Sequence, residues 1–520
     1  MGLALAAILR WILKIIFTMR NFFRQHAPTI SVALPALALS LAACGDDTGG
    51  DDPNNGGNGT GNGNGNGSVT VPDTYAFESR FNPGESSVAY NGQVARQVMI
   101  EELVGRLDGL TDALDSGDRV PAEDEIADEL LFYYEFDDAV GGAVEIGLST
   151  TPPILQSTFS DLGSGRDLVG KIAGNDPVGQ HQDWSMTFRG WGDQGSTTPD
   201  ALVRSWIDEL DVLAQERANN NPQLGPDGSP TAAFFVTADG RDLQQLVEKF
   251  LRVAIAFSQG ADDYLDDDTE GKGILTANTQ DDDAPYTVLE HQWDEGFGYF
   301  GAARDYLDYT DEEIAGAGGR AGWENGYHDT DGDGAIDLAS EYNFGHSTNA
   351  AKRDRGASSE AATDYTQQAI DGFLRGRAII AAAGDPLTDE EFADLQSARD
   401  EAVDAWERAI ASTAVHYIND TLQDMGKFGT DDYDFETHAK HWSELKGFAL
   451  GLQFNPRSPV TAEQFEELHD LIGTSPVLPN EGQARIDEYR QALLDARALL
   501  GSAYGFASEN LGNDDGTGGW

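Results

Sequence analysis

The chain has 520 residues, of which 90 are Asp or Glu and 33 are Lys or Arg, so its formal net charge at pH 7 is −57. Such a charge repels polyphosphates and argues against nucleic acid as a partner. Only eight of the cationic residues are lysines, and this excess of carboxylates is typical of halophilic proteins, in which most acidic side chains are solvated surface. The single cysteine excludes an intramolecular disulfide and a metal site built from several cysteines.

The N-terminal region has the features of a secretion signal. Arg20 and Arg24 precede an apolar run over residues 29–41, and small residues follow. A basic segment, a short apolar segment and small residues before a cleavage point make up a signal peptide. The sequence LAAC at 41–44 looks like a bacterial lipobox, in which the cysteine becomes the lipidated first residue. We therefore predict a signal region over 1–43 and lipidation at Cys44.

Residues 1–18 are also apolar, although Arg10 and Lys14 interrupt them. They are either a membrane segment or an extension upstream of the true start, and we expect the true start at Met19. Lipidation would hold the protein at the cell envelope, on the periplasmic or the exterior face of the outer membrane. The lipid anchor thus makes the membrane an expected partner.

Two segments cannot bury enough apolar surface to fold. Residues 44–68 are rich in Gly, Asn and Asp and should form a flexible tether behind the anchor. Residues 512–520 are predicted to be a flexible tail. The folded part is then expected over 69–511, which is long enough for two ordinary domains or one large one.

The folded part has the apolar periodicity of helices. Apolar residues recur at helical spacing over 94–110, 202–213, 243–257, 392–417 and 493–500, whereas strand-like alternation is scarce. Thr198 with Pro199 predicts one helix start, and capping boxes at Thr388 and Thr461 predict two more. The predicted fold class is mostly α, a helical bundle.

A faint internal repeat relates two of these helices. HQWDEGFGY at 291–299 and HWSELKGF at 441–448 both read W-x-E-x-x-G-aromatic with a histidine just upstream. Duplication of a bundle would explain the repeat and would give halves at about 69–310 and 360–511, with a long loop carrying a calcium site between them. Chance similarity between two aromatic helix starts is the alternative.

The sequence DTDGDGAID at 329–337 has the pattern of a calcium loop. Alternate carboxylates supply hard oxygens from one face of a tight turn, and glycine at the sixth position permits the bend. Ile336, at the eighth position, is expected to anchor the loop to the core. Position twelve is Ser340, so Glu341 would have to serve one residue later; the alternative is a disordered acidic turn. The predicted calcium ligands are Asp329, Asp331, Asp333, Ala335 through its carbonyl, Asp337 and Glu341.

Two His/Glu pairs are further candidates for metal binding. His291 with Glu295 lies at i, i+4, and His441 with Glu444 lies at i, i+3, so each pair shares one helix face. Imidazole with carboxylate suits zinc or iron, or a general acid–base pair. The alternative is a structural hydrogen bond near a helix end.

Four segments together resemble the DUF4856 family of bacterial lipoproteins: YNGQVAR at 90–96, HQWDEGFGYFG at 291–301, DTDGDGAIDLASEYNFGHSTNAAKRD at 329–354 and HWSELKGF at 441–448. The chain is also similar, more distantly, to imelysin-like proteins. That resemblance implies two helical bundle halves, an H-x-x-E metal signature at His441 and Glu444, and a link to iron acquisition at the envelope. The glycine that usually stands two residues before the signature histidine is replaced by Ala439.

Two functions are compatible with these features. The first is a lipid-anchored, calcium-stabilised binding protein for iron or another nutrient, acting with an outer-membrane receptor. The second is a metal-dependent hydrolase that uses the His/Glu pairs. No complete catalytic constellation is recognisable in the sequence, and this favours the binding protein.

Overall fold

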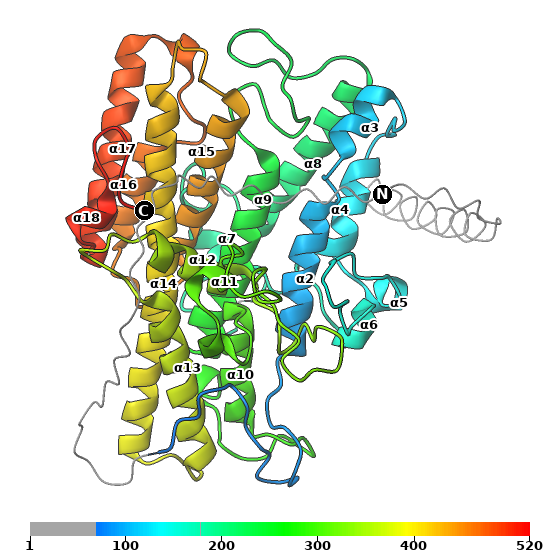
Figure 1. Cartoon of the computed structure of the whole chain (residues 1–520), viewed down its shortest axis with the longest axis vertical. Helices are drawn as coiled ribbons and strands as arrows, with labels where there is room; N and C mark the ends of the chain where they lie inside the picture. Colours follow the sequence, from blue (N-terminus) through cyan, green and yellow to red (C-terminus); the bar gives the residue numbers. More distant parts are fainter. Residues whose placement is uncertain (1–68, 177) are drawn as a thin grey trace, which may run out of the picture. The chain divides into compact units, whose positions relative to one another are not determined.

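The computed structural model describes residues 69–176 and 178–520. The predicted signal region, Cys44 and the tether lie outside the described residues. The prediction of a mostly helical bundle is confirmed, because helices dominate the described chain and its β pairing is limited to isolated bridges (Figure 1).

The longer helices are α2 (Asn91–Gly105), α4 (Glu125–Tyr134), α8 (Pro199–Ala218), α9 (Leu243–Leu251), α10 (Val288–Phe300), α12 (Gly345–Gly356), α13 (Tyr365–Ala382), α14 (Asp389–Gly426), α15 (Phe435–Ala449), α16 (Ala462–Ile472) and α17 (Gln483–Tyr504). Shorter helices are α3 (Leu110–Ser116), α5 (Asp138–Gly141), α6 (Phe159–Leu162), α7 (Trp184–Thr187), α11 (Asp311–Ile314) and α18 (Ser508–Leu511). Two π-helical segments, η1 (Arg252–Phe257) and η2 (Gly260–Tyr264), continue α9. The 3₁₀ turns are η3 (Gly273–Leu275), η4 (Tyr306–Asp308), η5 (Leu450–Gln453) and η6 (Pro479–Glu481).

The three helix starts predicted from the sequence are confirmed. The hydroxyl of Thr198 caps α8 with Pro199 in its first turn, and Thr388 and Thr461 form the capping boxes of α14 and α16. Each cap satisfies an N–H group that the helix itself leaves unpaired, which is why the pattern is readable in the sequence.

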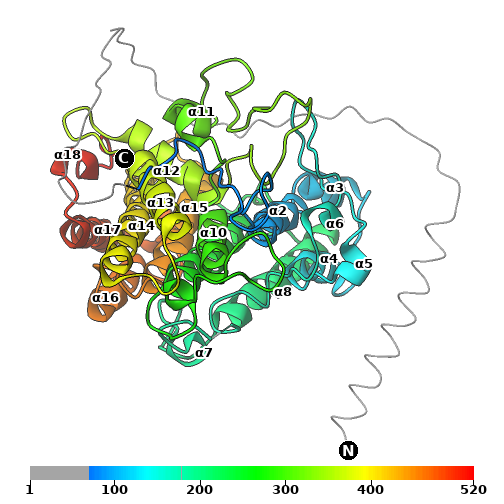
Figure 2. The same ribbon diagram turned by 90° about the horizontal axis from the view of Figure 1, so that it is seen from below.

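Helix α14, with 38 residues, is the longest helix of the described chain. It packs against α12, α13, α15 and α17, and Figure 2 shows these helices around it. Its inward side chains, including Trp406, Ile410 and Leu422, are fully buried. This packing places polar residues of α14 next to α12 and α15, where the candidate site lies.

An ionic network joins α10 to α13 inside the core. Arg377 is fully buried and donates from Nε to Oδ1 of Asp294 at 2.8 Å and from Nη1 to Oε1 of Glu290 at 3.0 Å. Tyr75 donates to the same oxygen of Asp294 at 2.8 Å. Charges buried this deeply need such partners, so the network fixes how the two helices meet.

The end of the described chain differs from the prediction of a flexible tail. Trp520 is only 6% exposed, its indole N–H donates to the carbonyl of Arg353 at 3.0 Å, and its carbonyl accepts from Asn419 at 3.0 Å. The glycine-rich composition of 512–520 suggests flexibility, but the buried indole of Trp520, its hydrogen bond to Arg353 and the hydrogen bond from Asn419 to its backbone carbonyl hold the segment against α12 and α14. None of the helices within the described ranges is long and apolar enough to cross a membrane.

Candidate metal centre

A cluster of imidazoles and carboxylates lies between α14 and α15. His416, Asp420 and Asp424 are spaced at i, i+4 and i+8 and therefore share one face of α14. His441 projects from α15 toward the same face. The long capped helix and its close packing against α15 hold these four side chains together.

Asp420 lies between two imidazoles. Its Oδ2 is 3.3 Å from Nε2 of His416 and 3.9 Å from Nε2 of His441. The side chains of His416, Asp420 and His441 are 29%, 21% and 18% exposed, so water reaches all three. Two imidazoles and one carboxylate form the donor set that zinc and non-haem iron use in proteins.

The other nitrogen of His441 is held by a second carboxylate. Nδ1 of His441 is 2.7 Å from Oδ2 of Asp424, whose side chain is 3% exposed and whose Oδ1 accepts from Lys427 at 3.1 Å. Burial raises the pKa of Asp424, but His441 and Lys427 together lower it by more, so the pKa lies below its ordinary value. An ionised carboxylate on Nδ1 leaves the lone pair of Nε2 free for a metal.

The two imidazoles differ in protonation. Burial and the nearby Arg353 hold the pKa of His416 well below its ordinary value, so this ring is neutral. Burial also opposes the charged form of His441, but Asp424 and Asp420 outweigh it and raise its pKa. A metal ion would therefore have to displace a proton from His441 more often than from His416.

The predicted pair of His441 and Glu444 does not act as a unit. Oε1 of Glu444 accepts from the hydroxyl of Tyr417 at 2.8 Å and lies 3.7 Å from the ammonium of Lys249. Its buried Oε2 has no hydrogen-bond partner. The H-x-x-E spacing thus places both side chains against α14, but His441 pairs with Asp420 and Asp424, whereas Glu444 pairs with Tyr417 of α14 and Lys249 of α9.

The second predicted pair, His291 with Glu295, is held by structural contacts. Nε2 of His291 is 3.9 Å from Oε1 of Glu295, which accepts from Gln93 at 2.8 Å. Nδ1 of His291 is 3.1 Å from the carbonyl of Ala89, and its ring stacks on Tyr286. These contacts give both side chains a role in joining α10 to α2.

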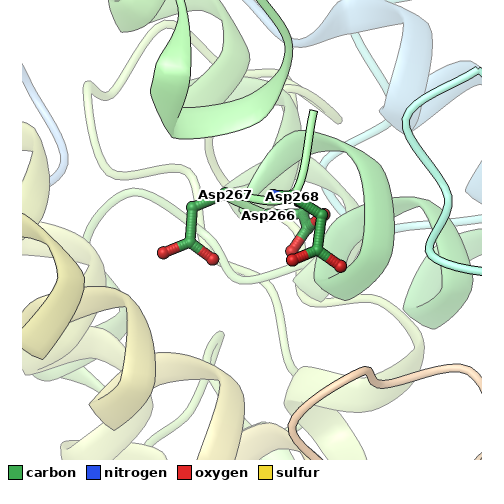
Figure 3. Close-up of side chains that lie close together, drawn as sticks. All are labelled: Asp266, Asp267 and Asp268. Atoms are coloured by element: carbon green, nitrogen blue, oxygen red, sulfur yellow. Dashed lines mark hydrogen bonds between the residues drawn. The ribbon is translucent and has the colours of Figure 1, made fainter. Parts of the chain in front are cut away.

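Within the described ranges, two groups of three carboxylates bring ligand atoms within 4.8 Å of one another, and neither contains a histidine. The ligand atoms of His416, Asp420 and His441 are therefore not all within 4.8 Å of one another, and the three side chains would have to move closer together to bind a metal. One of the acidic groups is Asp266, Asp267 and Asp268 (Figure 3). Arg457 lies 2.9 Å from Asp266 and Arg399 lies 3.3 Å from Asp267, so guanidinium groups already pair with two of the three carboxylates.

The other acidic group is the predicted calcium loop. Asp329, Asp331 and Asp333 each have a carboxylate oxygen in the group. Asp329 accepts from the backbone N–H groups of Gly332 at 2.8 Å and Gly334 at 3.0 Å. Gly334 has φ +90°, a conformation that favours glycine. The turn thus directs three carboxylates to one point.

The remaining predicted calcium ligands lie around this turn without joining the group. Glu341 accepts from the backbone of Thr330 and Asp337, each at 2.8 Å. Asp337 accepts from Gln156 at 2.6 Å. Ala335 donates its N–H to Asp333 at 2.8 Å. Calcium binding here stays a prediction.

Ile336 is the residue predicted to anchor the loop to the core. Its side chain is fully buried, and its backbone pairs with the chain at 153–155. The predicted calcium loop is therefore attached to the folded part at its eighth position.

Sequence reasoning missed His416, Asp420 and Asp424. The signal that could have found them is the H-x-x-x-D-x-x-x-D spacing at 416–424, which puts three chemistry-bearing side chains on one helix face. That face is apolar elsewhere along α14, and a polar stripe on a buried face is unusual.

Comparison with known proteins is informative over one part of the chain. No curated protein and no solved structure matches the chain. A family model matches residues 195–313, which include α8, α9 and α10 and end before the calcium loop and the His416 cluster. The matching family is DUF4856, described as a domain of unknown function, and this match supports the DUF4856 family for the chain.

Proposed function

We propose that this protein is a lipid-anchored binding protein of the bacterial envelope that captures a transition-metal ion, iron or zinc, between α14 and α15. The observation that carries the proposal is the position of the Asp420 carboxylate between the imidazoles of His416 and His441. The two imidazoles can bind as neutral ligands and Asp420 as a carboxylate, water reaches all three, and Asp424 orients His441.

Calcium at the Asp329 loop is proposed as a structural ion. Three carboxylates converge on a turn that is fastened to the core through Ile336. Free calcium outside cells is high enough to fill even weak sites of the extracellular kind. An outer-membrane receptor that takes over the captured metal is the proposed partner.

Metal analysis of the full-length protein tests this function. The purified protein should contain zinc or iron close to one ion per chain, and His441→Ala or Asp420→Ala should lose it. His291→Ala is the matched control, because it removes the other predicted His/Glu pair. Loss of the metal in His291→Ala but not in His441→Ala would move the site to α10.

The hydrolase alternative predicts that the same metal-loaded protein turns over a substrate. Screening it with peptide and ester substrates separates the two functions, since a binding protein gives no metal-dependent turnover. Metal-dependent turnover that His441→Ala abolishes would replace binding by catalysis.

A further inference from the structure

Arg353, on the neighbouring helix α12, is a buried cation that lacks a counter-ion. Arg353 on α12 is 7% exposed, and its Nε and Nη1 have no hydrogen-bond partner. Helix α12 packs against α14, and Trp520 links the two helices, because its indole N–H donates to the carbonyl of Arg353 and its own carbonyl accepts from Asn419, the residue next to Asp420. Burial lowers the pKa of Arg353, while the charges of Tyr417, Asp420 and Glu444 act in the opposite direction. Unpaired buried guanidinium N–H groups are costly and call for a ligand or water.

The neighbouring carboxylates have other hydrogen-bond or ion-pair partners, although Oε2 of Glu444 has none. Asp354 accepts from the backbone N–H groups of Tyr365 and Thr366, each at 2.8 Å, and so caps the start of α13. Oε1 of Glu444 accepts from Tyr417 at 2.8 Å, and Asp420 faces the two imidazoles. Arg353 therefore stays cationic and unpaired beside a site proposed for another cation.

A metal ion and an unpaired guanidinium repel each other unless an anion lies between them. Two imidazoles and one carboxylate leave coordination positions open on the metal. A carboxylate-type anion can bind the metal through one oxygen and accept N–H bonds from a guanidinium through its remaining oxygen, or through two remaining oxygens in carbonate. This arrangement would give the N–H groups of Arg353 hydrogen-bond acceptors and would replace the repulsion between the metal ion and the guanidinium by attraction of both to the anion.

We infer that the centre binds its metal together with a carboxylate-type anion, either carbonate or a small organic carboxylate, which the guanidinium of Arg353 holds. The inference rests on the proposed function, because it requires a metal between His416 and His441. Its rival is a water molecule that bridges Arg353 and the unpartnered Oε2 of Glu444.

Co²⁺ titration of the full-length protein, followed by visible absorption, tests the inference. Three buffers are compared: one free of carbonate and carboxylate, one with bicarbonate and one with acetate. In the wild type, bicarbonate or acetate should raise the Co²⁺ affinity by about tenfold or more, the size of an ordinary coupling between two ligands. The buffer that gives the gain identifies the source of the anion.

Variants assign the effect to Arg353. Arg353→Met should lose the gain, and Arg353→Lys should keep only part of it, because an ammonium cannot form the paired bonds of a guanidinium. Arg485→Met is the control, since Arg485 is exposed and pairs with Glu488 on the surface of α17. It should behave like the wild type.

The outcomes separate the inference from the proposed function. Equal Co²⁺ affinity in all three buffers would contradict the inferred anion but would not contradict the proposed metal centre. The absence of Co²⁺ binding in every buffer would refute both. If Arg353→Met folds and bicarbonate or acetate still raises its Co²⁺ affinity as much as in the wild type, Arg353 does not hold the anion. If that variant misfolds or binds no Co²⁺, Arg353→Lys provides the test. An unreduced effect of the anion on Co²⁺ affinity in Arg353→Lys contradicts the inference, and a reduced effect supports it.

Discussion

Nδ1 of His441 lies 2.7 Å from Oδ2 of Asp424, although the two residues belong to different helices. This pairing joins α15 to α14 and leaves Nε2 of His441 directed toward Asp420. A carboxylate behind a histidine sets its tautomer and orientation, so Asp424 acts on the proposed metal through His441.

Asp424→Asn should therefore weaken Zn²⁺ binding by about 10- to 100-fold, the usual effect of losing such a partner. Competition against a chromophoric chelator measures the affinity. Asp404→Asn is the control, because Asp404 is an exposed residue of the same helix that pairs with Arg408. Wild-type affinity in Asp424→Asn would contradict the role given to this carboxylate.

Calcium should raise the melting temperature of the full-length protein, because a ligand that binds only the folded state stabilises it by mass action. Asp331→Ala or Asp333→Ala should abolish most of this gain, since each removes one of the three converging carboxylates. The measurement is thermal unfolding with and without calcium at fixed ionic strength, with the exposed Asp432→Ala as control. An unchanged melting temperature in the wild type would count against the site.

His346 should make the protein sensitive to acid. It is 1% exposed, neither ring nitrogen has a partner, and burial followed by the charge of Arg252 lowers its pKa from 6.5 to about 3. Between these values the unfolded chain binds a proton that the folded chain does not, so this residue reduces the free energy of unfolding as the pH falls, by about 1.4 kcal/mol per pH unit.

His346→Met replaces the imidazole with an apolar side chain of similar size that cannot be protonated. The variant therefore lacks this contribution to the pH dependence of stability. Urea unfolding at neutral and at acidic pH should show a smaller loss of stability in the variant than in the wild type. The same acid-induced loss in both proteins would show that His346 is not the group responsible.

Removing Arg377 should destabilise the fold strongly. Arg377→Met leaves Asp294 buried without a cation, while Glu290 keeps its ion pair with Arg80, and leaving a buried charge unpaired costs about 3–5 kcal/mol in comparable cases. Arg375→Met, on the same helix, breaks only a half-exposed pair with Glu401 and should cost less than about 1 kcal/mol. Chemical denaturation measures both, and similar losses in the two variants would contradict the network's role.

Cys44→Ala should release the protein from the membrane, because the predicted lipid chains supply the hydrophobic attachment. Cell fractionation with detection of the protein measures this. A variant that still fractionates with membranes would locate the anchor in residues 1–18 instead.

The sequence by itself determined the helical class, the capped starts of α8, α14 and α16, and the burial of Ile336. These features follow from local rules, because side-chain spacing, capping and turn geometry involve residues within a few positions of one another. The acidic loop at 329–337 was recognisable for the same reason.

Only the tertiary structure decided which polar residues meet. His441 was singled out with Glu444 because they share a helix face, but its partners are Asp420 and Asp424 of α14. Likewise, the buried position of Trp520 depends on Arg353 and Asn419, far away in the chain. Such contacts depend on how α12, α14 and α15 pack, which no local pattern in the sequence encodes.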